Sequence, residues 1–346
     1  MEFGITTFAE AIPENEEGVA LSHSVRIQHL MEEVKLADAI GLDVYGIGEH
    51  HRKDMAASAP EVILAGAATV TKQIRLTSAT TIISSEDPVR VFQAFATGDA
   101  LSNGRMEIMV GRGSFTESFP LFGYSLDDYD ELFNEKLELL MKIREQEVMD
   151  WEGKHRPAIQ NLGVYPRPVQ ESLPIWVGSV GTKESVLRAA RLGLPISFAI
   201  IRTQKPADFA PLIKLYKEEG MKAGHDPKQL LVSAHFHGFI GRTDSEAVRK
   251  FFPSAQAMLN VFGKEKGRGT YSRQDFDKAR SREGAMFVGS PETVADKIIH
   301  LKQHLDLDRF LLHLPLGPMP HEDIMKAIEL YGKEVAPRVR KALFQQ

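Results

Sequence analysis

Apolar segments of strand length alternate with amphipathic helical segments over the whole chain. Eight strands, each followed by a helix, are predicted at residues 3–8, 42–47, 74–78, 105–111, 174–178, 195–201, 230–241 and 309–314. Such alternation is typical of α/β proteins with parallel sheets, because a helix returns the chain to the edge where the next strand begins. Eight repeats in 346 residues favour one (β/α)8 barrel, a TIM barrel, over residues 1–346. An open doubly wound sheet is disfavoured, because neither G-x-G-x-x-G after a strand nor G-x-x-x-x-G-K-[ST] is present.

The connection after the seventh strand is longer than a barrel needs. About forty residues, 244–285, separate this strand from the helix near Pro291. The segment is charged and contains several glycines, which suits a mobile cover better than a packed element. It is interpreted either as a solvated surface excursion or as an active-site lid. In a lid, Arg280 and Arg282 are the candidates to close over an anionic ligand or an acidic substrate.

The fifth strand runs into a glycine- and hydroxyl-rich turn, P-I-W-V-G-S-V-G-T, before a helix begins. Gly178 and Gly181 allow a ligand to approach the backbone, and Ser179 and Thr182 add hydroxyl donors. Because a helix N-terminus carries free N–H groups and positive dipole charge, this turn is a candidate phosphate site. An ordinary strand-to-helix turn with Thr182 as N-cap is the alternative.

Arg112 lies between two glycines at the end of the fourth strand, in V-G-R-G-S. Its guanidinium can bind an anion, although a structural salt bridge is equally common for such an arginine. Since the fourth and fifth strands are neighbours in a barrel, Arg112 and Ser179 are expected to converge.

Two histidine pairs fall on predicted strands. His50 and His51 follow the second strand, where alternation points them in opposite directions, so at most one faces the site. We expect one to be a polar or acid/base group and the other structural. His235 and His237 share one face of the seventh strand and are candidates for a pocket, and His313 on the eighth strand is weaker evidence of the same kind. No H-E-x-x-H or equivalent cluster is present, so no metal is expected.

Composition narrows the class of protein. The chain has no cysteine, which excludes disulfides and thiol catalysis. Its net charge of −5 and the lack of a long basic block argue against nucleic-acid binding. No secretory signal pattern or membrane-spanning apolar run is found, so a cytoplasmic enzyme is expected.

Taken in order, six segments resemble the bacterial luciferase-like monooxygenase family. They are G-E-H-H at 48–51, D-P-V-R-V at 87–91, L-S-N-G-R at 101–105, V-G-R-G at 110–113, P-I-W-V-G-S-V-G at 174–181 and F-V-G-S-P-E-T-V at 287–294. The resemblance extends from Phe3 to about Arg340. It implies a (β/α)8 barrel that uses reduced flavin mononucleotide (FMN) with oxygen, or a deazaflavin coenzyme as hydride carrier.

The resemblance also implies roles for particular residues. Arg112, Ser179 and Thr182 would hold the flavin phosphate, and His50 matches the catalytic histidine beside the flavin ring. Ser78-Ala79 matches a non-proline cis peptide that supports the ring, and Phe8 is assigned with His235 and His237 to the substrate pocket. A cysteine of the light-emitting α subunit corresponds to Gly111 here, so light emission is not expected.

The leading hypothesis is an FMN-dependent monooxygenase that acts on a small organic substrate and receives reduced FMN from a separate reductase. Deazaflavin-dependent hydride transfer and a non-catalytic flavin-binding protein are the alternatives. A homodimer is expected through helices on the side of strands one to four, where Phe92 and Phe95 are available for burial.

Overall fold

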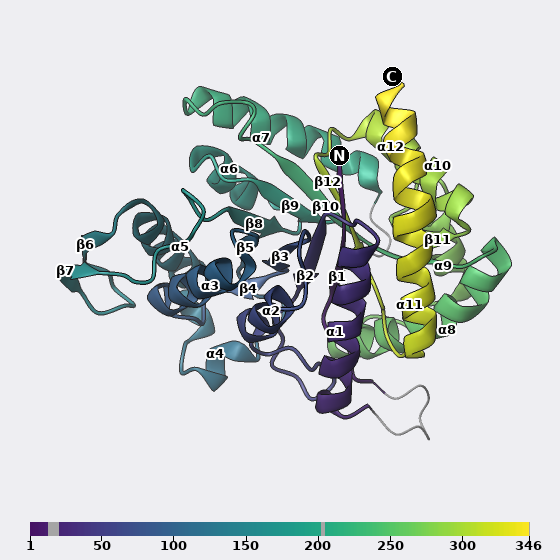
Figure 1. The fold of residues 1–346 in the computed structure, drawn as a ribbon, viewed down its shortest axis with the longest axis horizontal. Coiled ribbons are helices and arrows are strands. Elements are labelled where there is room, and N and C mark those ends of the chain that lie inside the picture. Colours follow the sequence, from purple (N-terminus) through teal and green to yellow (C-terminus); the bar gives the residue numbers. More distant parts are fainter. Residues whose placement is uncertain (13–20, 202–204, 346) are drawn as a thin grey trace.

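All eight predicted strands form, and they close into a parallel barrel surrounded by helices (Figure 1). The computed structural model describes residues 1–12, 21–201 and 205–345. Around the barrel the strands are β1 (Glu2–Thr7), β2 (Val44–Ile47), β3 (Arg75–Ser78), β5 (Met106–Gly111), β8 (Ile175–Ser179), β9 (Ile196–Ala199), β10 (Val232–Ile240) and β12 (Arg309–His313). The ring closes because β12 pairs in parallel with both β1 and β10.

Helices follow the strands and cover the outside of the barrel. They are α1 (His23–Ala39), α2 (Pro60–Ala68), α3 (Pro88–Ser102), α4 (Ser118–Leu121), α5 (Tyr129–Glu145), α6 (Lys183–Arg191), α7 (Ala210–Lys222), α8 (Asp244–Glu265), α9 (Arg273–Arg280), α10 (Pro291–His304), α11 (His321–Leu330) and α12 (Ala336–Phe344). Both ends of α3 are capped. The Asp87 side chain accepts from the Val89 and Arg90 N–H groups, and Asn103 ends the helix in the left-handed conformation.

An antiparallel hairpin that the sequence did not predict lies at residues 148–163. Strand β6 (Val148–Trp151) pairs with β7 (Ile159–Gly163), and Figure 1 shows the hairpin projecting from the barrel beside α5. Met149 and Trp151 are buried while Val148 and Asp150 are exposed, which is the alternation of a half-buried strand. Two short strands, β4 (Thr81–Ile82) and β11 (Met286–Gly289), also went unpredicted.

The segment 244–285 is largely helical and packed, so the expectation that it is not a packed element is wrong, and its role as a lid stays a prediction. Helix α8 takes up 22 residues and buries an apolar face that includes Phe251, Met258 and Phe262. Helix α9 begins with a capping box between Ser272 and Asp275. Gly267 and Gly269 lie between the two helices, and Gly267, which follows the end of α8, has φ +63°.

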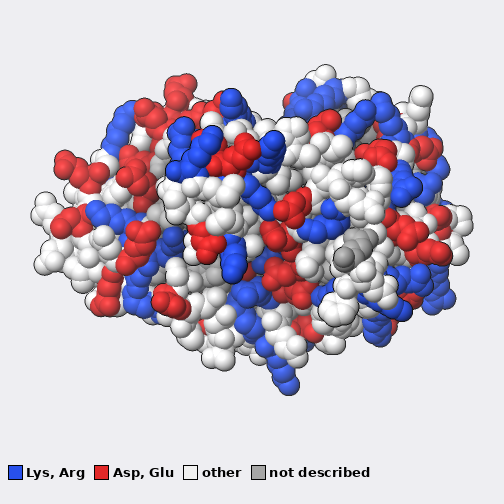
Figure 2. Space-filling view, turned by 90° about the horizontal axis from the view of Figure 1, so that it is seen from above, with Lys and Arg blue, Asp and Glu red and all other residues white. Residues whose placement is uncertain are grey.

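Phe92 and Phe95 are fully buried within the chain, against the barrel and its neighbouring helices. They are therefore not available to a second subunit, and the expected homodimer loses the residues on which it was based. Acidic and basic side chains intermingle over the face in Figure 2, where neither sign forms a continuous band. Among the described residues, no helix has the length and apolar character that a membrane crossing requires.

The interior of the barrel is filled in layers by residues at alternate strand positions. At the N-terminal end of the strands, Arg309 makes a bidentate ion pair with Glu107, at 2.7 and 3.1 Å, and its Nε donates to Glu2. Above this floor lies a separate apolar cluster of Val44, Met109, Trp176 and Leu311. The Arg309 guanidinium lies over the Trp176 ring, 4.3 Å from its centroid, which joins the two layers.

Replacing Glu107 with Ala is expected to lower the free energy of unfolding by about 3–5 kcal/mol, because the buried Arg309 charge loses its bidentate partner. The measurement is urea denaturation followed by circular dichroism. Arg75→Ala is the control, because Arg75 contacts the same carboxylate but its side chain is 42% exposed. That variant should lose about 1 kcal/mol or less. Equal losses would show that the floor of the barrel does not depend on the buried pair.

Candidate functional site

Polar side chains form the layer above the apolar cluster, towards the C-terminal ends of the strands. Thr6 of β1 and His237 of β10 are both register partners of His313 of β12. Their side chains therefore meet inside the barrel, and the His237 and His313 ring centroids are 5.3 Å apart. His235 lies two residues earlier on the same face of β10, with its Nδ1 3.5 Å from the Thr6 Oγ1. The expectation that His235 and His237 share one face is confirmed.

Glu10 joins this layer from the segment that follows β1. Its Oε1 lies 3.2 Å from the Nε2 of His313, and its Oε2 accepts from the Thr7 hydroxyl. Glu10, His313 and Thr7 are all buried. Glu10 was missed by sequence reasoning because it follows the strand, where no periodicity indicates the direction of a side chain.

His50 and His51 lie in different environments, as alternation predicted. The His50 ring packs edge-on against Phe8 and Phe115, with centroid distances of 4.4 and 5.1 Å. Burial, with the nearby His313 second, lowers the pKa of His50 to about 3 and keeps the ring neutral. Its Nδ1 is buried without a hydrogen-bond partner among the described residues. His51 instead bonds to Glu49 at 2.9 Å, which raises its pKa.

A cis peptide bond follows β3, one residue later than the sequence predicted: it joins Ala79 to Thr80 rather than Ser78 to Ala79. The Ala79 N–H still donates to the Ile47 carbonyl of β2, so the regular ladder extends through the Ser78–Ala79 bond. After the cis bond the Thr80 side chain lies over Gly111 and Gly178. A Cβ at Gly178 would lie 2.7 Å from the Thr80 methyl carbon, and one at Gly111 would collide with the Thr80 hydroxyl.

The hydroxyl-rich turn after β8 begins α6, with Thr182 as N-cap as the structural alternative predicted. The Ser185 hydroxyl lies 2.6 Å from that of Ser179 and 2.9 Å from that of Thr182. Gly181 has φ +95°, a conformation that L side chains rarely adopt, and its N–H donates to the Ser179 hydroxyl. Three hydroxyls and the N-terminus of a helix therefore meet at one edge of the barrel.

Arg112 follows β5, which pairs directly with β8. It bonds to Asp130 at 2.6 Å, so the salt-bridge alternative also has support. Arg188 of α6, which sequence reasoning missed, lies near enough that the Arg112 charge helps to lower its pKa, second to burial. The Arg188 Nη1 is buried without a hydrogen-bond partner among the described residues. Two guanidiniums, one of them incompletely bonded, and the hydroxyl turn fit a doubly charged phosphate.

Arg280 and Arg282 are not brought to these groups. Arg280 ends α9, where its carbonyl accepts from Lys297 of α10, and Arg282 is exposed. The end of α8 reaches the barrel mouth instead. The Phe262 and Phe115 ring centroids are 4.9 Å apart, and Arg52 bonds to Glu265 of α8 at 2.6 Å and to Glu117 at 2.8 Å. One part of the segment 244–285 thus covers His50, but as a helix end.

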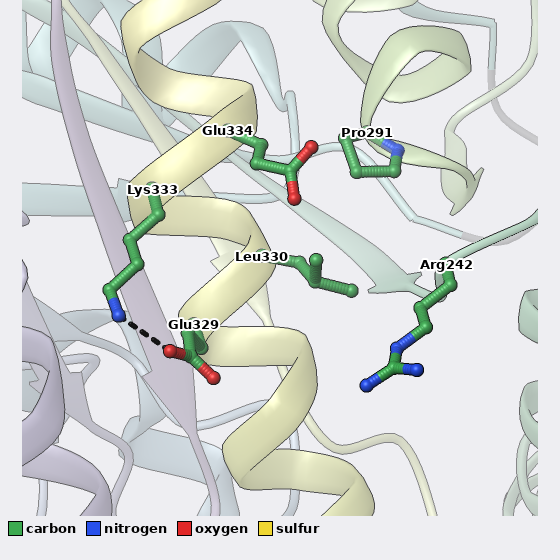
Figure 3. A pocket seen from close by; sticks show the side chains of 6 residues that line it. All are labelled: Arg242, Pro291, Glu329, Leu330, Lys333 and Glu334. Carbon is green, nitrogen blue, oxygen red and sulfur yellow. Dashed lines mark hydrogen bonds and ion pairs between the residues drawn. The ribbon is translucent and has the colours of Figure 1, made fainter.

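Two other features lie away from this region. A surface hollow between Arg242, the start of α10 and the α11–α12 junction is lined by Glu329, Lys333 and Glu334 (Figure 3). Its cationic and acidic groups balance, and Lys333 already pairs with Glu329. Asp128, Glu131 and His155 also lie close enough to share a metal ion, but Lys154 is bonded to Glu131.

Comparison with known proteins identifies the family. The model of the luciferase-like monooxygenases matches residues 1–307. The chain belongs to this family. A full-length relative is the uncharacterized protein y4vJ of Sinorhizobium fredii, 23% identical over 97% of this chain and 98% of that protein. The N-acetyl-S-alkylcysteine monooxygenase of Bacillus subtilis is 31% identical over 50% of this chain and 51% of its own length.

Solved structures show the same fold at low identity. Monooxygenase RslO1 from Streptomyces bottropensis has a TM-score of 0.86 at 22% identity, covering 97% of this chain and 99% of its own. The oxygenating constituent of 3,6-diketocamphane monooxygenase from Pseudomonas putida, in complex with FMN, has 0.77 at 19%, covering 98% of both. The coenzyme F420-dependent tetrahydromethanopterin reductase of Methanopyrus kandleri has 0.73 at 21%, covering 98% and 99%. The (β/α)8 barrel and the family resemblance are thus confirmed.

Arg52→Ala is expected to loosen the end of α8 from the barrel mouth, because three carboxylates lose their shared partner. At about 1–2 kcal/mol for the set, trypsin cleavage at Lys264, Lys266 and Arg268 should become roughly 5- to 30-fold faster. Arg249→Ala, an exposed arginine on the same helix, is the control and should change nothing. An unchanged cleavage rate in Arg52→Ala would mean that the ion pairs do not hold this segment.

Proposed function

We propose that this family member is a monooxygenase that uses reduced FMN and oxygen on a small organic substrate. The observation that carries the proposal is the set of anion-binding groups at the β5 and β8 ends, one residue away from the strand positions that face the barrel interior. A ligand with a phosphate at one end and a flat ring at the other fits both regions. When bound, reduced FMN supplies the electrons with which oxygen is activated.

The phosphate half of the proposal assigns Arg112, Ser179 and Thr182 to the anion, with Gly178 and Gly181 giving the backbone room. Arg188 adds a second guanidinium from α6. Because Asp130 already pairs with Arg112, the two arginines and one carboxylate leave one net positive charge for the ligand. The N-terminus of α6 adds the positive end of its dipole.

The ring half assigns His50 to hydrogen bonding or proton transfer beside the flavin, with Ser78, Ala79 and Thr80 behind the ring. A neutral histidine can accept a proton or donate one from its single N–H. The aromatic rings of Phe8 and Phe115 hold His50 in place and keep water from it. Phe8, His235 and His237 would then face the substrate.

Hydride transfer with a deazaflavin coenzyme is the second candidate function. Support comes from the fold shared with the F420-dependent reductase, at a TM-score of 0.73. Titration with FMN and with F420, followed by protein fluorescence, separates the two proposals. Supply of reduced FMN by a separate reductase, a cytoplasmic location and a homodimer also belong to the proposal.

Arg112→Ala and Arg188→Ala should each weaken FMN binding by about 1.5–3 kcal/mol, the scale of a charge-assisted hydrogen bond. Riboflavin, which lacks the phosphate, should bind the wild type and both variants equally. Fluorescence titration measures both ligands, and Arg191→Ala, at the exposed end of the same helix, is the control. Equal losses for FMN and riboflavin would refute the phosphate assignment.

His50→Ala should leave FMN affinity nearly unchanged and lower turnover by about 10²- to 10⁴-fold, if the ring transfers or holds a proton. The measurement is product formation with reduced FMN supplied by a reductase. His51→Gln is the control, because glutamine can retain a hydrogen bond to Glu49. A variant at position 50 that turns over like the wild type would make His50 structural.

A further inference from the structure

The proposed flavin site leaves Glu10, His313 and Thr6, which are buried inside the barrel, without a role. They form a series of contacts that leads from Glu10 through His313 and Thr6 to His235, with successive distances of 3.2, 3.3 and 3.5 Å. Glu10, His313 and Thr6 are at most 4% exposed, and His235 is partly buried. Buried polar groups must satisfy one another, so the positions of their protons can be derived from the contacts.

The direction of the hydrogen bonds in this series is set at Glu10. The Ala9 N–H donates to the Thr7 Oγ1 at 3.0 Å, so the Thr7 hydroxyl proton is free to be donated to the Glu10 Oε2 at 3.2 Å. The other carboxylate oxygen faces the Nε2 of His313. An ionised carboxylate only accepts hydrogen bonds, so a neutral His313 ring beside it has its single proton on Nε2.

The hydrogen bonds continue in the same direction from His313 through Thr6 to His235. With its proton on Nε2, His313 has a lone pair at Nδ1, which accepts from the Thr6 hydroxyl. Thr6 has then used its only proton and can only accept, so the His235 Nδ1 must donate to it. Burial lowers the pKa of His235 to about 3, so its ring is neutral and has a single proton. The His235 Nε2 is left with a lone pair.

We propose that Glu10, His313 and Thr6 are positioning residues that fix His235 as a hydrogen-bond acceptor inside the barrel, and so select an organic substrate with a neutral donor, a hydroxyl or an amide N–H. The substrate-selecting part rests on the proposed function. An anionic substrate would meet a lone pair with the Glu10 carboxylate behind it. The basic side chains expected to favour acidic substrates, Arg280 and Arg282, lie elsewhere.

Nitrogen-15 NMR of histidine-labelled protein tests the tautomers without flavin or substrate, so its outcome is independent of the proposed function. His235→Gln and His313→Gln assign the two rings. In the wild type we expect His313 with its proton on Nε2 and His235 with its proton on Nδ1. Thr6→Val should leave His313 unchanged and release His235 from a single tautomer, and Thr6→Ser should restore it.

Ser233→Ala is the matched control, because Ser233 lies two residues before His235 on the same inward face of β10 and should not affect the tautomer. Glu10→Gln keeps the size of the side chain but can also donate, so His313 should become a mixture of tautomers. A wild-type His235 with its proton on Nε2, or a wild-type His313 with protons on both nitrogens, would overturn the proposal. A Thr6→Val protein in which His235 is unchanged would overturn it as well.

The substrate class is tested with two probes of similar shape, benzamide and benzoate, added to the same labelled protein. Benzamide should shift the His235 Nε2 resonance at least tenfold more than benzoate at equal concentration. Thr6→Val should remove that preference. An equal response to the two probes, including no response to either, would overturn the assignment of substrate class while leaving the tautomer result and the flavin proposal standing.

Discussion

The bidentate ion pair between Arg309 and Glu107 fills the N-terminal end of the barrel interior, and the other interior layers pack above it. The two residues lie on β12 and β5, which are opposite each other in the ring of eight strands, so the pair spans the interior. The apolar cluster of Val44, Met109, Trp176 and Leu311 lies directly above it. Because these two layers fill the lower half, a ligand can reach the interior only from the C-terminal ends of the strands.

Because side chains alternate along a strand, the functional groups lie on both faces of the part of the sheet that β5 and β8 form. On β5, Gly111 faces inward, and Arg112, the next residue, leaves the barrel towards Asp130. On β8, Gly178 faces inward and Ser179 faces α6. The anion-binding groups therefore lie on the outer side of the wall formed by β5 and β8, whereas the inward positions of the same two strands face the interior that contains the histidine layer of β10 and β12. This separation suits a ligand that is charged at one end and planar at the other.

The sequence predicts the position of a residue correctly where a regular period determines the direction of its side chain. The buried strands, the common face of His235 and His237, and the divergence of His50 and His51 all follow from alternation. The sequence does not indicate a role for Glu10, which follows a strand in irregular backbone, or for Arg188, which resembles any solvated helical arginine. The cover at 244–285 was misjudged because α8 has a polar face as well as an apolar one, so its charges hid a packed helix. The family resemblance placed the cis bond one residue too early, since the β2–β3 ladder extends through the Ser78–Ala79 bond.

The Thr80 side chain fills the space next to both Gly111 and Gly178, so the three positions share one limited volume. A methyl group added at either glycine has to be removed from residue 80, since the strands themselves are held in register by their neighbours. A side chain added at either glycine alone would therefore collide with Thr80, whereas a paired exchange conserves the space. A cysteine at position 111 would need a residue smaller than threonine at position 80, so side-chain volume can be exchanged between these strands without moving them.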